Sequence, residues 1–139
     1  MSEGQAHMEL VEQMVEWLTG SFLRGDRGYV LLDSAGRSQN RKPPLVWGYV
    51  PDVYVTRNAR YDCIIGEAKV RGDLENNHTE QQITAFLRKC SESTASLFVF
   101  AVPWDIVPAA ISLLAYCQKR CGYVSVETKV LEKLKGQSS

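Results

Sequence analysis

The chain has 139 residues, which is enough for one domain with a hydrophobic core but too few for two. Apolar residues make up 45% of the sequence and charged residues 23%, and no apolar run reaches the roughly 18 residues of a membrane span. The net charge is zero, which argues against a strongly electrostatic nucleic-acid binder. Residues 1–7 lack the pattern of a secretory signal, so we expect an intracellular, cytoplasmic protein with one domain over 1–139 and a frayed tail at 136–139.

The N-terminal half combines one helical pattern with three β-rich runs. Apolar residues recur at helical spacing over residues 6–19: Val11, Met14, Val15 and Leu18. Residues 28–33 predict a first strand, and a polar loop rich in serine, asparagine and arginine follows over 34–44. Two further β-rich runs, 45–56 and 60–70, are joined by a short polar link, which predicts a hairpin.

The C-terminal half alternates helices with strands. A threonine and a glutamine three residues apart form a helix-capping pattern, which predicts a helix over 79–90. The continuous apolar run 96–102 predicts a strand buried on both faces, and a second helix is expected over 106–120. A weaker strand at 122–128 and a short helix at 130–135 complete the chain. This order predicts an α/β fold with a mixed central sheet flanked by helices.

The residues that carry chemistry lie on the predicted hairpin. Pro51-Asp52 stands on its first run, and Glu67-Ala68-Lys69 follows on the second run after fourteen intervening residues. This pair of motifs, in this order of elements, resembles the PD-(D/E)XK nuclease superfamily over about residues 8–121. The resemblance implies a restriction-endonuclease-like α-β-β-β-α-β core with the motif on its second and third strands. It also implies a Mg²⁺- or Mn²⁺-dependent endonuclease that cuts DNA.

Elementary chemistry supports the same interpretation of these residues. Alternate side chains of a strand share a face, so Glu67 and Lys69 project together about 7 Å apart, with Asp52 beside them on the partner strand. The two carboxylates and the backbone carbonyl of Ala68 offer the hard oxygen ligands that Mg²⁺ prefers. Lys69 would orient the attacking water and help to lower its pKa. The alternative is a structural Glu67–Lys69 ion pair at the end of a strand.

The resemblance also indicates supporting residues on the two neighbouring helices. Members of the superfamily often place an acidic residue of the first helix at the site, and Glu12 is the candidate that borders the apolar face, as a further metal ligand. A glutamine on the helix after the second motif often steadies the site, which Gln82 would do as a catalytic residue, with Gln81 contacting substrate. A solvated glutamate and a helix-capping glutamine are the plain structural alternatives.

A local excess of basic residues offsets the zero net charge. Residues 1–16 hold four glutamates and no lysine or arginine, so the rest of the chain is net basic. Arg41 and Lys42, on the loop that enters the hairpin, and Arg71, directly after the second motif, are candidates to hold the nucleic-acid backbone. A solvated basic surface without a partner is the equal alternative.

Three kinds of function remain open at this point. The first is an endonuclease on nucleic acid, DNA rather than RNA, with no membrane partner. It would act as a structure-selective homodimer, as a subunit of a repair, recombination or restriction assembly, or as a phage or viral enzyme. The second is a catalytically silent nuclease fold that serves as a binding or assembly subunit. The third is an unrelated α/β domain in which the motif is coincidental.

Overall fold

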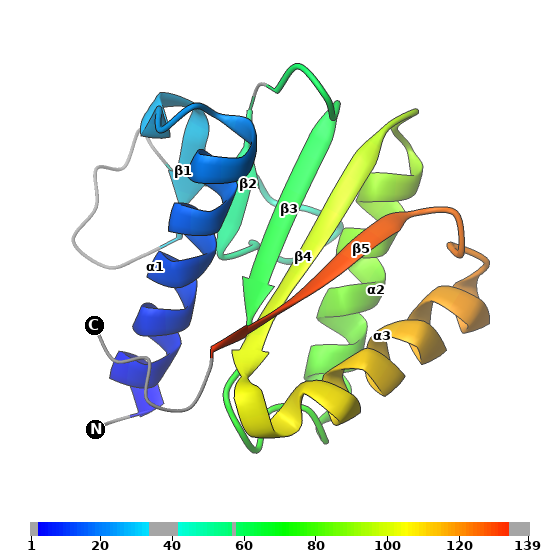
Figure 1. Cartoon of the computed structure of the whole chain (residues 1–139). Helices are drawn as coiled ribbons and strands as arrows, with labels where there is room; N and C mark the ends of the chain where they lie inside the picture. The colour runs from blue at the N-terminus through cyan, green and yellow to red at the C-terminus, as the bar shows by residue number, and fades with distance from the viewer. Residues whose placement is uncertain (1–2, 34–41, 57, 134–139) are drawn as a thin grey trace.

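The fold is organised around one mixed β-sheet of five strands (Figure 1). The computed structural model describes residues 3–33, 42–56 and 58–133. The strands are β1 (Val30–Leu32), β2 (Val53–Val55), β3 (Cys63–Ala68), β4 (Ser96–Pro103) and β5 (Glu127–Lys133). The helices are α1 (Glu3–Phe22), α2 (Asn77–Ser91) and α3 (Val107–Cys121), with short 3-10 turns η1 (Arg27–Tyr29) and η3 (Trp104–Ile106).

The strands lie side by side in chain order, but their directions change halfway across the sheet. The order is β1-β2-β3-β4-β5, in which β1, β2 and β3 pair antiparallel and β3, β4 and β5 pair parallel. Helices α2 and α3 provide the two crossovers that the parallel pairs require. The protein is therefore of the predicted α/β class, with a mixed sheet flanked by helices.

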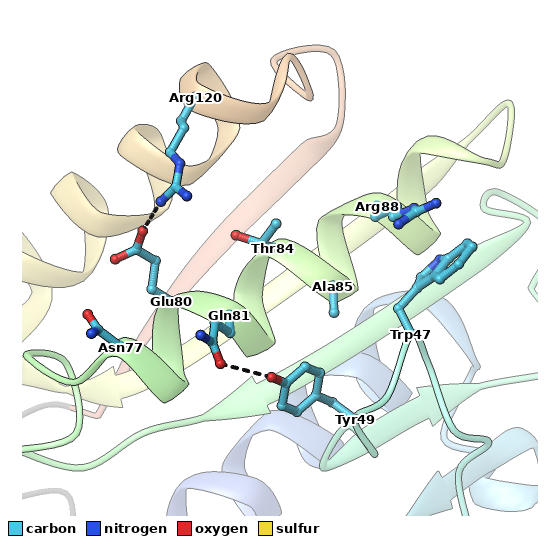
Figure 2. Close-up of a pocket in the computed structure, with 9 residues that line it drawn as sticks. All are labelled: Trp47, Tyr49, Asn77, Glu80, Gln81, Thr84, Ala85, Arg88 and Arg120. Carbon is cyan, nitrogen blue, oxygen red and sulfur yellow. Dashed lines mark hydrogen bonds and ion pairs between the residues drawn. The ribbon is translucent and has the colours of Figure 1, made fainter.

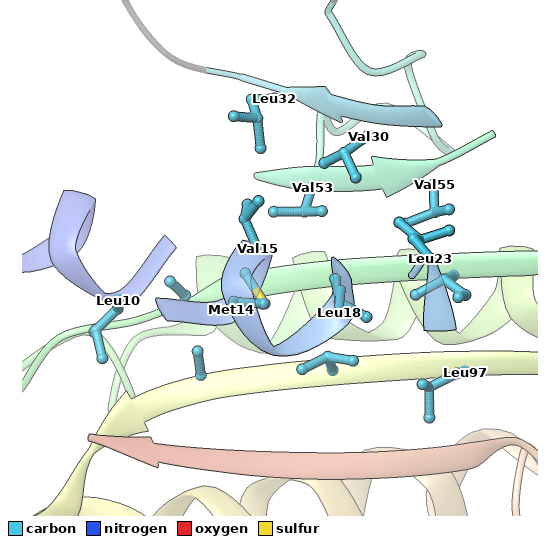
Figure 3. Packing of buried hydrophobic residues seen from close by; sticks show 14 of the residues in the cluster. Leu10, Met14, Val15, Leu18, Leu23, Val30, Leu32, Val53, Val55 and Leu97 are labelled. Carbon is cyan, nitrogen blue, oxygen red and sulfur yellow. The ribbon is translucent and has the colours of Figure 1, made fainter. Parts of the chain in front are cut away.

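Helix α1 covers one face of the sheet by itself. Its fully buried stripe repeats at helical spacing: Leu10, Met14, Val15 and Leu18. This stripe packs on aliphatic side chains of β1, β2 and β4, as Figure 3 shows: Val30, Leu32, Val53, Val55 and Leu97. Burying each such side chain stabilises the fold by roughly 1.5–3 kcal/mol, so this contact fixes α1 against the strands that carry the motif.

Helices α2 and α3 cover the opposite face. There Phe86 of α2 packs against Phe98 of β4, and Leu114 of α3 belongs to the same buried cluster. Strand β4 is buried along nearly its whole length, as its continuous apolar run predicts for a strand between two helical layers. Among the described residues, no helix is long and apolar enough to cross a membrane.

Three of the predicted elements differ from the structure. The expected strand at 122–128 is displaced to Glu127–Lys133, and the predicted short helix at 130–135 is wrong over its described part. Val130 and its neighbours pair in parallel with β4, and this pairing overrides their local preference for a helix. The β-rich run 45–56 is a strand only at Val53–Val55. Most of the predicted polar loop, 34–41, lies outside the described residues.

Candidate active site

The two motif carboxylates meet where β2 and β3 pair. Asp52 lies immediately before β2, and Glu67 lies near the end of β3. The antiparallel register joins Val53 to Gly66, which places Asp52 opposite Glu67. Only 8% of Asp52 and 3% of Glu67 is exposed, so the two acidic residues share one buried position at the edge of the core.

A reciprocal pair of hydrogen bonds holds the two carboxylates together. The backbone N–H of Asp52 donates to Glu67 Oε1 over 3.0 Å, and the backbone N–H of Ala68 donates to Asp52 Oδ2 over 2.8 Å. Each strand therefore uses a backbone donor to hold the carboxylate of the other strand. Buried carboxylates require such partners, and these bonds fix the direction of both side chains.

Lys69, the residue directly after β3, completes the cluster. Its ammonium Nζ lies 3.3 Å from Glu67 Oε2 and donates a hydrogen bond of 2.6 Å to Gln82 Oε1 on α2. The lysine side chain is largely buried, so its position is defined by these two partners. The structure thus brings together four of the residues singled out in the sequence: Asp52, Glu67, Lys69 and Gln82.

The electrostatics of this cluster are dominated by the buried negative charge. The pKa of Glu67 is raised well above its ordinary value, first because burial penalises the carboxylate and second because Asp52 adds a like charge. Lys69 acts in the opposite direction on the pKa of Glu67. The ammonium of Lys69 forms an ion pair with one of the two carboxylates, that of Glu67.

The donor chemistry of the cluster fits a hard divalent cation. Asp52 and Glu67 are oxygen donors on adjoining strands, and Mg²⁺ is commonly held in proteins by one or two carboxylates together with water and substrate phosphate. Within the described ranges, no group of three or more His, Cys, Asp and Glu side chains forms a ready-made metal cage. Asp52 and Glu67 are the residues whose carboxylate oxygens would hold such an ion.

Helix α1 contributes a histidine that the sequence reasoning missed. His7 Nε2 lies 3.0 Å from Asp52 Oδ2, and this hydrogen bond is the main cause of the raised pKa of His7. A signal was present in the sequence, because His7 precedes Leu10 by three residues and Met14 by seven, and so lies on the buried stripe of the helix.

Glu12, the expected acidic residue of the first helix, is placed elsewhere. Its carboxylate pairs with Arg27 over 2.6 Å, and both side chains are close to half exposed. The reason is the phase of the helix: the buried stripe is centred on Leu10 and Met14 rather than on Val11. This phase turns His7 toward the site and Glu12 away from it.

The expected substrate-binding residues are dispersed. Arg71 forms an ion pair with Asp105 of η3. Lys42 is exposed on the segment that leads to β2, and Arg41 lies outside the described residues. Gln81 accepts a hydrogen bond of 3.1 Å from the hydroxyl of Tyr49 and lines a pocket on the outer side of α2 (Figure 2).

Comparisons with known proteins returned no relative. Neither a scan against protein-family models nor searches of curated proteins and of solved structures gave a match to this chain.

Proposed function

We propose that this chain is a metal-dependent endonuclease of the PD-(D/E)XK kind that hydrolyses phosphodiester bonds in DNA. The observation that carries the proposal is the convergence of Asp52, Glu67 and Lys69 at one buried position on two adjoining strands. The order α1, β1, β2, β3, α2, β4 is also the element order of the restriction-endonuclease-like core, with the motif residues at its second and third strands.

The residues would divide the hydrolytic work as follows. Asp52 and Glu67 hold Mg²⁺ or Mn²⁺, with the carbonyl of Ala68 as a further oxygen donor. A bound divalent ion supplies positive charge for the developing phosphorane and lowers the pKa of water. Lys69 directs its ammonium toward the attacking water and the charged phosphate oxygens.

Two further side chains would position these groups. Gln82 holds the ammonium of Lys69 through its amide oxygen, and His7 holds Asp52 through Oδ2. Neither has to contact the scissile phosphate to matter, because a nuclease needs its carboxylates and its ammonium aligned before substrate arrives. We class both as positioning residues.

The experiment is a cleavage assay on the purified chain. Supercoiled, linear, branched and single-stranded DNA and a single-stranded RNA are incubated with Mg²⁺ or Mn²⁺, beside a Lys69→Ala variant and an EDTA control. The proposal expects products that disappear with EDTA and with the variant. Tight binding of nucleic acid without cleavage in either metal would instead identify a catalytically silent binding subunit.

A further inference from the structure

A tryptophan occupies a turn position that ordinarily favours glycine or asparagine. Val46 and Tyr49 form an isolated β-bridge across the two residues Trp47 and Gly48, whose φ angles are 47° and 93°. Two consecutive positive φ angles are the requirement of a type I′ turn, which Asn-Gly fulfils at the lowest cost. A bulky residue in this conformation is strained, and such strain persists where the side chain is needed.

The indole of Trp47 is partly exposed to solvent, and two neighbouring side chains hold it in place. Trp47 is 49% exposed. Its Nε1–H donates to Glu92 Oε2 over 3.1 Å, and the guanidinium carbon of Arg88 lies 3.5 Å from the centroid of its ring. Among the described residues, no carboxylate pairs with Arg88, so its charge is not already neutralised by an ion pair. The result is a fixed planar stack with a cation at its surface.

This stack forms one wall of a pocket of about 490 Å³. In Figure 2, α2 runs between Trp47 and Tyr49 on one side and Arg120 of α3 on the other, and Gln81 and Arg88 lie on the helix. Arg120 pairs with Glu80. The volume is within the range of small-ligand sites. Aromatic rings, an amide and guanidinium groups are the side chains that stack on nucleobases and contact their edges and phosphates.

The pocket adjoins the candidate active site through helix α2. Tyr49 donates to Gln81 Oε1, and the next residue, Gln82, accepts from Lys69 of the carboxylate cluster. Tyr49 also stands only three residues before Asp52 on the same chain segment. The pocket and the carboxylate cluster are thus linked through neighbouring residues of α2 and of the segment before β2.

We propose that this pocket binds an unpaired nucleobase of the strand whose phosphodiester bond reaches Asp52 and Glu67. Bases inside a duplex are stacked on their neighbours, so only a single-stranded or extruded base can enter a side pocket and lie against Trp47. The inference rests on the proposed nuclease function. It predicts that the nuclease prefers single-stranded, flapped or branched DNA to continuous duplex DNA.

The test is a binding measurement in EDTA, where no cleavage occurs. Fluorescence anisotropy follows a short labelled DNA single strand and its duplex on the wild-type chain, and tryptophan emission, to which Trp17, Trp47 and Trp104 all contribute, is recorded in the same titration. We expect tighter binding of the single strand, with quenching of tryptophan emission. Trp47→Ala should weaken single-strand binding about tenfold, in line with the loss of one base–aromatic stack.

Three further variants separate stacking from general effects. Trp47→Phe should keep most of the affinity but lose the quenching, and Arg88→Ala should weaken binding. The matched control is Tyr29→Ala, which removes another exposed aromatic ring that does not line this pocket. Wild-type affinity in Trp47→Ala, or preference for the duplex, would overturn the inference.

Failure of this inference is distinguishable from failure of the nuclease proposal. Metal-dependent cleavage with Trp47-independent binding would leave the nuclease intact and remove the base pocket. Trp47-dependent binding of single strands without cleavage of any substrate would keep the base pocket and remove the nuclease.

Discussion

Glu67 is the residue whose position is hardest to explain by stability alone. It occupies a core strand, is almost wholly buried, and faces a second carboxylate from Asp52. Burial first and the charge of Asp52 second raise its pKa above the ordinary value of 4.5. An uncharged residue at this position would avoid both the burial of a charge and the repulsion from Asp52. The arrangement of charges in the cluster therefore lowers the stability of the fold.

Replacing Glu67 by glutamine should therefore change how the stability of the metal-free protein depends on pH. A group with a raised folded-state pKa contributes its stability in acid and loses it as pH rises through that pKa, whereas glutamine does not ionise. We expect the free energy of unfolding of Glu67→Gln in EDTA, relative to that of the wild type, to be higher at pH 8 than at pH 5. Urea denaturation at both pH values measures this difference, and a relative stability that falls with rising pH would contradict the expectation.

Gln82 should control the position of Lys69 rather than the fold. Its side chain accepts the short hydrogen bond from Lys69 Nζ at the rim of the cluster. We expect Gln82→Ala to slow cleavage by about tenfold with little change in substrate affinity, as for other supporting residues around a metal site. Single-turnover rates and binding constants separate the two quantities. A weaker affinity at an unchanged rate would assign Gln82 to substrate binding instead.

The sequence alone predicted the site residues on the hairpin, but it did not predict which residue of the first helix reaches the site. Asp52, Glu67 and Lys69 come together because strand alternation and hairpin pairing are local rules that can be applied without a structure. His7 reaches Asp52 across a long sequence separation, which depends on how α1 is rotated on the sheet. Because His7 and Glu12 point about 140° apart on the helix, the rotation of α1 decides which of them faces the sheet.

At the scale of elements, the close approach of α1 to β3 depends on Gly66. A Cβ built on this residue would lie 2.6 Å from the sulfur of Met14 and 3.3 Å from Cβ of Val53. Neither gap accommodates a methyl group without movement in a packed core. Gly66 therefore sets the distance between α1 and the sheet, and with it the contact of His7 with Asp52.

Gly66→Ala should destabilise the protein by about 1–3 kcal/mol, because the added methyl group overpacks the core. The same substitution should cost less in a Met14→Ala background, where the sulfur that it meets is absent. A double-mutant cycle in urea measures this coupling. Equal costs in both backgrounds would show that Met14 is not the obstacle.

Strand β5 illustrates where local sequence patterns were insufficient. Residues 127–133 contain glutamates, lysines and a leucine, all compatible with a helix, and their weak alternation gives no clear strand signal. These residues nevertheless form a strand, because they pair in parallel with the edge of β4. By contrast, α1, α2, α3 and β4 follow strong apolar patterns, and the sequence located them to within a few residues.

At the scale of the whole molecule, the site joins both helical layers to the sheet. His7 comes from α1, Asp52 and Glu67 from the β2–β3 pair, and Gln82 from α2. A ligand bound at this junction would contact only the assembled fold, since these residues are far apart in an unfolded chain. Binding should thus stabilise the whole domain by mass action.

Mn²⁺ should raise the melting temperature of the wild-type protein but not that of Asp52→Asn. At a metal concentration of about 100 times the dissociation constant the expected gain is roughly 2.7 kcal/mol, or about 10 °C for a domain of this size. Thermal scans with and without Mn²⁺ measure the shift, with Ser112→Ala on the exposed face of α3 as a control variant. An equal shift in Asp52→Asn would place the metal elsewhere.

A single-turnover cleavage rate decides whether Asp52, Glu67 and Lys69 form one hydrolytic site. The rate is measured in saturating Mg²⁺ for the wild-type chain and for Lys69→Ala, with the affinity for the same DNA determined in parallel. We expect a rate at least about 100-fold lower in the variant at nearly unchanged affinity. Cleavage by Lys69→Ala at the wild-type rate, or no cleavage by the wild-type chain on any substrate, would contradict it.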